Sequence, residues 1–249
     1  MTLKKIIGII GSPRKGKLTD KLVSRCLEGV KSNGTETKKI YLIDYDVPIY
    51  TEEAICPEEL NSLCEEADAI IIGAPVYWGC INGLTKNFMD TVRISNSNGK
   101  YGLGISVAGG TGKGLCSAVQ NIYRFFYHRR FRAIEPTPVS RFNFEQIIES
   151  ILKSGQKLAE LPSEKEPFKG DRDRIKYYEN LNFLNNTFLD EMLLLVSQLI
   201  QISKSKSGFE IAMEEYDSAK NLILQGKREN AIDHIVKAYD TLYFEPKED

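Results

Sequence analysis

The chain has little histidine and no cysteine pair at metal-binding spacing, and both absences limit its chemistry. The only two histidines, His128 and His234, lie far apart in the sequence. A histidine-based metal site or a Ser-His-Asp triad therefore has little support. The five cysteines are odd in number and include no C-x-x-C motif. We therefore expect free, mostly buried thiols and no metal site.

The sequence also lacks an excess of charge and a long hydrophobic run. Its formal net charge is -1, which gives no global attraction to nucleic acid or to an anionic membrane. The first five residues lead directly into a strand-like segment without the apolar region of a signal peptide. The most apolar helical stretch, 192–202, is too short to span a bilayer. These features predict a cytoplasmic protein without nucleic-acid or membrane partners.

What the chain does have is an alternation of aliphatic strand-like runs and amphipathic helical segments over residues 1–162. Continuous aliphatic runs are typical of buried parallel strands, and the alternation predicts an α/β fold with a doubly wound parallel sheet. The expected strands are 5–10, 37–43, 69–73, 102–108 and 131–138, and the expected helices are 20–31, 57–67, 83–92, 115–127 and 144–161.

The character of the sequence changes near Pro162. Residues 163–174 are charged and contain Pro167 and Gly170, so we interpret them as a linker. Residues 175–249 show no strand pattern and predict a helical extension with helices at roughly 175–203, 208–225 and 228–243. The simplest interpretation is a helical appendage that packs on the first domain or on a second subunit.

Three loops follow the first, third and fourth expected strands. The first, 11–19, offers hydroxyl groups, an arginine and the positive end of the helix that follows, a combination that binds a phosphate without a metal. The second, 74–79, holds a rigid proline, a tyrosine and the only tryptophan of the chain, which suit a flat aromatic ring. The third, 109–114, is rich in glycine and allows close approach of backbone to a ring.

Parallel sheets bind ligands at the carboxyl ends of their strands. If the strand order is the flavodoxin-like 2-1-3-4-5, the three loops share one rim. A ligand with a phosphate at one end and a fused ring at the other would contact all of them, and flavin mononucleotide (FMN) is such a ligand.

The chain resembles the NADPH-dependent FMN reductase family of flavodoxin-like flavoproteins, which includes the iron–sulfur flavoproteins. The resemblance covers about residues 3–160 and rests on G-S-P-R-K with Thr19, A-P-V-Y-W-G, K-x-F-x-D at 86–90 and A-G-G-T-G-K-G at 108–114. It implies a flavodoxin-like five-stranded sheet with bound FMN. The implied contacts are Ser12, Arg14, Gly16, Lys17, Leu18 and Thr19 around the phosphate, Pro75, Val76, Tyr77, Trp78 and Gly79 around the ring and ribityl chain, and Gly109, Gly110 and Thr111 near the far side of the ring.

The sequence also departs from the family pattern. Leu18 stands where family loops often carry asparagine, and Thr91 where the K-x-F-x-D stretch usually continues with arginine. Iron–sulfur members carry four cysteines after the second strand, whereas this chain has only Cys56 there. One thiolate cannot hold a cluster that needs four ligands, so we predict no iron–sulfur cluster.

The resemblance implies an FMN-dependent NAD(P)H oxidoreductase that passes electrons from a nicotinamide co-substrate to a flavin, quinone or similar small acceptor. Because FMN carries the chemistry, no catalytic side chain is required. The family also implies a homodimer or a higher homo-oligomer. Two alternatives stay open: an FMN-binding electron carrier, and an interaction module that works through the C-terminal helices.

Overall fold

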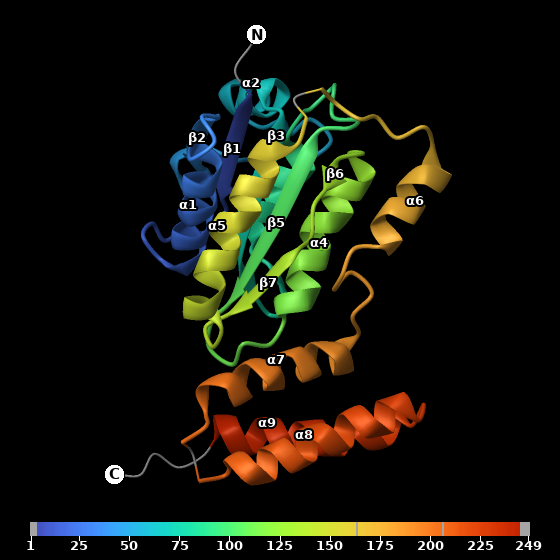
Figure 1. The fold of residues 1–249 in the computed structure, drawn as a ribbon. Helices are drawn as coiled ribbons and strands as arrows, with labels where there is room; N and C mark the ends of the chain where they lie inside the picture. The colour runs from blue at the N-terminus through green and yellow to red at the C-terminus, as the bar shows by residue number, and fades with distance from the viewer. Residues whose placement is uncertain (1–3, 163, 206, 245–249) are drawn as a thin grey trace.

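A parallel sheet with helices on both faces forms the larger part of the molecule, and a group of helices lies across one end of it (Figure 1). The computed structural model describes residues 4–162, 164–205 and 207–244. The ends of the predicted domains at 1–3 and 245–249, and Ser163 of the predicted linker, lie outside the described residues.

The strand order confirms the predicted flavodoxin-like sheet. The main path runs β2-β1-β3-β5-β6, all parallel, which is the order 2-1-3-4-5 with β5 as the fourth strand. The strands are β1 (Lys5–Ile10), β2 (Glu36–Tyr41), β3 (Ala69–Tyr77), β4 (Cys80–Ile81), β5 (Tyr101–Ala108), β6 (Arg132–Ala133) and β7 (Thr137–Ser140).

The fifth strand differs from the sequence-based expectation because it forms in two pieces. β6 and β7 both pair with β5, and residues 134–136 separate them. Pro136 lies in this gap, and a proline has no N–H to donate to the sheet. After this gap, β7 extends to Ser140, which pairs with Ala108 at the carboxyl end of β5. The three loops of the site lie at this end of the sheet.

Helices cover the two faces of the sheet through separate apolar cores. One core joins β1, β3 and β5 to α1 and α5, and the other joins the opposite face to α2, α3 and α4. The helices of this part are α1 (Leu18–Lys31), α2 (Glu58–Glu66), α3 (Gly83–Thr91), α4 (Leu115–His128) and α5 (Phe144–Glu160), with a short 3-10 helix η1 (Leu42–Asp44). Each helix turns apolar side chains to the sheet at helical spacing, as its sequence predicts.

A buried lysine ties α2 to the amino end of β5. Lys100 is 1% exposed, and its Nζ donates hydrogen bonds to the carbonyl oxygens of Cys64 at 3.2 Å, Ala67 at 2.7 Å and Glu65. A cation at a helix C-terminus satisfies carbonyl groups that have no partner within the helix. Burial nevertheless lowers the pKa of the Lys100 ammonium, since desolvation disfavours the charged form.

The helical extension contains one more helix than the sequence predicts. The expected helix at 175–203 is divided into α6 (Asp171–Glu179), which begins within the predicted linker 163–174, and α7 (Phe188–Ile202). These are followed by α8 (Phe209–Leu224) and α9 (Arg228–Tyr243). The break at 180–187 is rich in asparagine, and Thr187 begins α7 with a capping box in which Asp190 donates its N–H to the Thr187 hydroxyl.

Helices α7, α8 and α9 form their own apolar core and lie below the carboxyl ends of β5 and β7 (Figure 1). Their attachment includes a hydrogen bond from the Ser140 hydroxyl to Gln198 Oε1 at 2.5 Å and one from the Tyr239 hydroxyl to the Thr111 carbonyl at 2.9 Å. Among the described residues, no helix is long and apolar enough to cross a membrane.

Candidate flavin site

The three predicted loops border one cavity at the carboxyl ends of β1, β3 and β5. Its volume is about 770 Å³, within the range of about 300 to 1,000 Å³ that is typical of small-molecule sites. Of the predicted contact residues, Gly16 alone lies outside the cavity lining. The predicted residues that line it are Ser12, Arg14, Lys17, Leu18, Thr19, Pro75, Val76, Tyr77, Trp78, Gly79, Gly109, Gly110 and Thr111.

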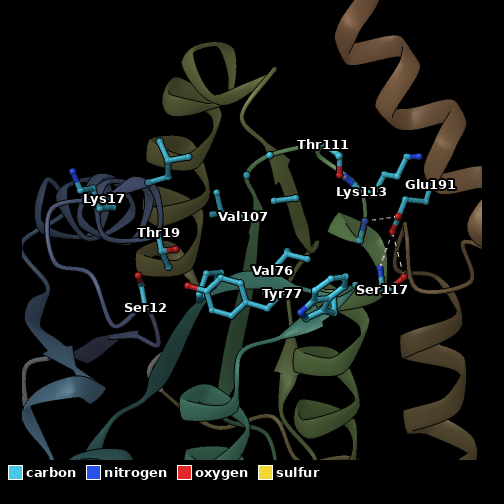
Figure 2. A pocket seen from close by; sticks show the side chains of 18 of the residues that line it. Ser12, Lys17, Thr19, Val76, Tyr77, Val107, Thr111, Lys113, Ser117 and Glu191 are labelled. Atoms are coloured by element: carbon cyan, nitrogen blue, oxygen red, sulfur yellow. Dashed lines mark hydrogen bonds between the residues drawn. The ribbon is translucent and has the colours of Figure 1, made fainter. Parts of the chain in front are cut away.

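The loop between β1 and α1 forms the cationic end of the cavity. Arg14 and Lys17 line it, and among the described residues neither side-chain cation has a hydrogen-bonded or ion-paired partner. The N-terminus of α1 has no side-chain cap, so the first N–H groups of the helix remain available as donors. Ser12, Lys17 and Thr19 lie together on this side of the cavity, and the hydroxyl groups of the loop come from Ser12 and Thr19 (Figure 2). This arrangement has the donors and the positive charge that a phosphate requires.

Neighbouring polar groups fix the shape of this loop. Gly16, predicted among the residues around the phosphate, donates its N–H to Asp20 Oδ2 at 2.6 Å, and this bond fixes the turn that leads into α1. On the other side, Asn82 donates its side-chain amide to the Gly11 carbonyl at 2.8 Å, and the Thr85 hydroxyl donates to Asn82 Oδ1 at 2.6 Å. The loop is therefore held in place before any ligand arrives.

Asp20 stays ionised although it is 5% exposed. Burial raises the pKa of this carboxyl, but hydrogen bonds from the Gly16 N–H, the Tyr41 hydroxyl, Ser24 and Lys39 together outweigh burial, and the net pKa lies below 3.8. The Lys39 Nζ is 3.3 Å from Asp20 Oδ1. These donors offset the negative charge, so a phosphate in front of the loop meets less repulsion from Asp20.

The second loop is a tight hairpin turn that presents aromatic surface. β3 and β4 pair antiparallel through Tyr77 and Cys80, and the two residues between them have positive φ, 54° at Trp78 and 78° at Gly79. Two positive φ angles define a type I′ turn, for which glycine and asparagine are preferred. A tryptophan in this conformation costs about 1–2 kcal/mol. Its ring is fully exposed and lines the cavity, so the strained turn places a free aromatic face at the site.

The glycine-rich loop after β5 closes against this turn. A Cβ on Gly114, where φ is 90°, would lie 2.5 Å from the Gly79 Cα and 2.9 Å from Val76 Cγ1. Only glycine allows the two loops to approach this closely. Gly109 and Gly110 have no heavy atom within 4 Å of an added Cβ. Their backbone therefore faces open space, where a planar ligand can lie directly against it.

Helix α7 completes the lining with residues that the sequence patterns did not predict. Phe188, Glu191 and Met192 border the cavity together with Lys113 and Ser117. Figure 2 shows Glu191 beside Thr111 and Lys113, across the cavity from Ser12 and Thr19. Lys113 belongs to the glycine-rich motif and could have been found from it. The α7 residues lie far away in the sequence, outside the three loop motifs.

The comparison with known proteins identifies the family of the chain. The profile of the NADPH-dependent FMN reductases matches residues 4–136, more than half of the chain. The chain belongs to this family of FMN-dependent, flavodoxin-like oxidoreductases. The matched region includes all three loops and ends before the helical extension.

A relative supports the family, and solved structures share the fold. The chain is 34% identical over 137 residues to an iron–sulfur flavoprotein of Methanocaldococcus jannaschii, which covers 49% of this chain and 71% of that protein. The fold of this chain is similar to that of an NADH:FMN oxidoreductase in its apo form. The two are 18% identical with a TM-score of 0.54, and the match covers 66% of this chain and 95% of the other. An NAD(P)H:quinone oxidoreductase of Methanothermobacter marburgensis gives 12% identity, a TM-score of 0.52 and coverage of 65% and 100%.

The residues present fit FMN, but they do not fit the iron–sulfur cluster in the name of the first relative. Four of the five cysteines are buried, and Cys56, in the segment after β2, contacts the Thr91 hydroxyl at 3.1 Å. Within the described residues no three histidine, cysteine or acidic side chains gather as metal ligands. The absence of a cluster stays a prediction, and an absorbance spectrum will test it.

Proposed function

We propose that the protein is an FMN-dependent NAD(P)H oxidoreductase that passes electrons from a nicotinamide to a flavin, quinone or similar small acceptor. One observation carries the proposal: a single cavity joins free cations and an uncapped helix N-terminus at one end to exposed aromatic and glycine surfaces at the other. Membership of the FMN reductase family supports flavin as the ligand.

The chain's own residues would bind and orient the flavin. Arg14, Lys17 and the N-terminus of α1 would hold the phosphate, and the backbone of the 75–79 turn and of the glycine-rich loop would contact the ring. When bound, FMN supplies two-electron chemistry in which NAD(P)H, one proton and a quinone give NAD(P)⁺ and a quinol. The side chains need only bind and orient the flavin and its substrates, since protons can come from solvent.

Nothing in the cavity demands a thiol nucleophile. Burial, with a smaller effect of Glu191, raises the pKa of the Cys116 thiol at the start of α4 to about 12. A thiol with this pKa stays protonated and unreactive at neutral pH. Cys116 is therefore unsuited to act as a nucleophile at neutral pH, and we expect activity without a catalytic cysteine.

Anaerobic reduction tests the proposal. Apoprotein is loaded with FMN, freed of excess flavin and mixed with NADH or NADPH, and the visible flavin bands are followed. Bleaching by either nicotinamide, followed by recovery when a quinone is added, is the expected result. If neither nicotinamide bleaches the bound flavin while a strong chemical reductant does, the electron carrier becomes the better assignment.

The same preparation tests two further expectations. Flavin bands without a broad iron–sulfur shoulder would agree with the predicted absence of a cluster. Light scattering would determine whether the protein forms the homodimer or higher homo-oligomer that the family resemblance implies.

A further inference from the structure

Helix α7 gives the cavity a wall that lies outside the part of the chain that matches the FMN reductase family. That match ends at residue 136, whereas Phe188, Glu191 and Met192 of α7 line the cavity. The flavin-binding loops of the family therefore do not account for this wall. Its chemistry must be explained from its own contacts.

The Glu191 carboxylate fastens α7 to the N-terminus of α4. Oε1 accepts a hydrogen bond from the Gly114 N–H at 2.6 Å, and Oε2 accepts from the N–H groups of Cys116 at 2.9 Å and Ser117 at 3.1 Å and from the Ser117 hydroxyl at 3.3 Å. The first residues of α4 include no side-chain cap of their own. A carboxylate from a distant helix thus caps α4, where the helix dipole also favours negative charge.

This attachment determines what α7 presents to the cavity. Residues three and four apart lie on the same face of a helix, so Phe188 and Met192 flank the turn that carries Glu191. The four donors on the Glu191 carboxylate also offset its charge, so a carboxylate at the cavity need not repel an electron-rich ligand. The helical extension is held at further points, including the bond from Tyr239 to the Thr111 carbonyl at 2.9 Å. The wall is therefore fixed in place.

The apolar side chains at the cavity are left uncovered. Phe188 is 84% exposed, and the Trp78 ring on the opposing turn is fully exposed, yet both line the same cavity. Exposed large apolar groups that surround a cavity indicate a surface that a ligand covers. Met192 adds a flexible thioether, which packs well against aromatic rings.

We propose that α7 forms one wall of the electron-acceptor site, opposite the turn that carries Trp78. In this proposal, which rests on the proposed function, Phe188 and Met192 are specificity-determining residues that favour planar, apolar acceptors over small hydrophilic ones. Glu191 is a positioning residue, because it acts by holding that wall on α4. The helical extension is then part of the active site in the same chain.

Substitution of Phe188 tests the wall directly. Because Phe188 is largely exposed, F188A removes little from the protein core. The matched control is L224A, since Leu224 is also 84% exposed and lies on α8 outside the cavity lining. The acceptors are menadione, a planar naphthoquinone, and ferricyanide, a small hydrophilic ion. We expect F188A to lower the ratio of kcat/KM for menadione to that for ferricyanide by about tenfold, mainly through the KM for menadione. L224A should leave the ratio at its wild-type value.

A binding measurement separates the wall from the reductase activity. Menadione is titrated calorimetrically into the oxidised, FMN-loaded protein without a reductant. F188A and E191Q should both raise the dissociation constant, E191Q because a side-chain amide cannot accept from all four donors. A merely structural role of Glu191 would lower stability without changing this constant for the folded protein.

The outcomes are distinguishable. The proposed role of α7 would be overturned if F188A changed neither the menadione dissociation constant nor the ratio of kcat/KM values. It would also be overturned if L224A changed this ratio as much as F188A does. Failure of NADH and NADPH to reduce the wild-type protein would instead overturn the proposed function, while the menadione titration would still report on the wall.

Discussion

The cationic loop leads to the sharpest prediction, because two adjacent cations have different surroundings. Arg14 lines the cavity. Lys15, the next residue, lies outside the lining and forms an ion pair with Asp44 at 2.6 Å. If the loop holds the FMN phosphate, R14A should weaken FMN binding and K15A should not. The two substitutions remove the same charge within one loop, so they separate a direct contact from a general loss of positive potential.

The magnitude follows from the hydrogen bonds at stake. A hydrogen bond to a charged group contributes about 1.5–3 kcal/mol. At about 1.4 kcal/mol per factor of ten, R14A should raise the FMN dissociation constant roughly 10- to 150-fold. The Lys15–Asp44 pair is about half exposed on both sides, and such surface pairs contribute at most about 1 kcal/mol to stability. K15A should therefore fold normally and bind FMN within about threefold of wild type.

The protein carries its own reporter for this assay. Trp78 is the only tryptophan of the chain and lines the cavity, so FMN added to apoprotein should quench tryptophan emission. Riboflavin has the same ring and no phosphate, and R14A should bind it as tightly as wild type does. The phosphate assignment is refuted if R14A keeps wild-type FMN affinity, or if its affinity for riboflavin falls as much as that for FMN.

Three further predictions concern stability and the shape of the site. G114A should destabilise the fold by about 1–3 kcal/mol through overpacking and weaken FMN binding, whereas G109A, whose added Cβ meets open space, should change urea unfolding far less. The Asp20 carboxyl has a folded pKa below 3.8, so its contribution to stability is present above pH 3.8 and is lost as the pH falls through the folded pKa. The free energy of unfolding should therefore fall less steeply with decreasing pH in D20N. An identical pH profile of D20N and wild type would contradict this assignment. K100M should cost about 1–3 kcal/mol in urea unfolding because it leaves buried carbonyl groups of α2 without a donor, and K38M, which removes an exposed ion pair, should cost less than about 1 kcal/mol.

Much of the fold could be predicted because its signals are local. Each aliphatic run ends in a loop whose glycines, proline or hydroxyl residues specify a turn, and parallel pairing brings these turns to one rim. The two-piece fifth strand was missed because its pattern is only slightly disturbed by Pro136. The break before α7 could have been found from Thr187 and Asp190, which form a capping box.

The α7 wall could not be predicted in the same way. Glu191 and Gly114 lie 77 positions apart in the sequence, and contact at such a separation follows from packing of the whole chain. A retrospective signal does exist: Glu191 and Gln198 are polar residues on the buried face of α7, whose other buried side chains are apolar. Buried polar groups need partners, but the sequence does not say where the partners lie.

The capping of α4 by Glu191 has a consequence for the order of synthesis. The loops at 11–19 and 74–79 come early in the chain. Glu191 and Tyr239, which contact the glycine-rich segment, are synthesised more than 100 residues later. On the ribosome, the sheet can form while the donors at the start of α4 are still hydrated. The binding surface would reach its final form only after α9 has emerged. Flavin loading should thus follow the emergence of α7 and α9 from the ribosome, because these helices complete the contacts of the glycine-rich segment.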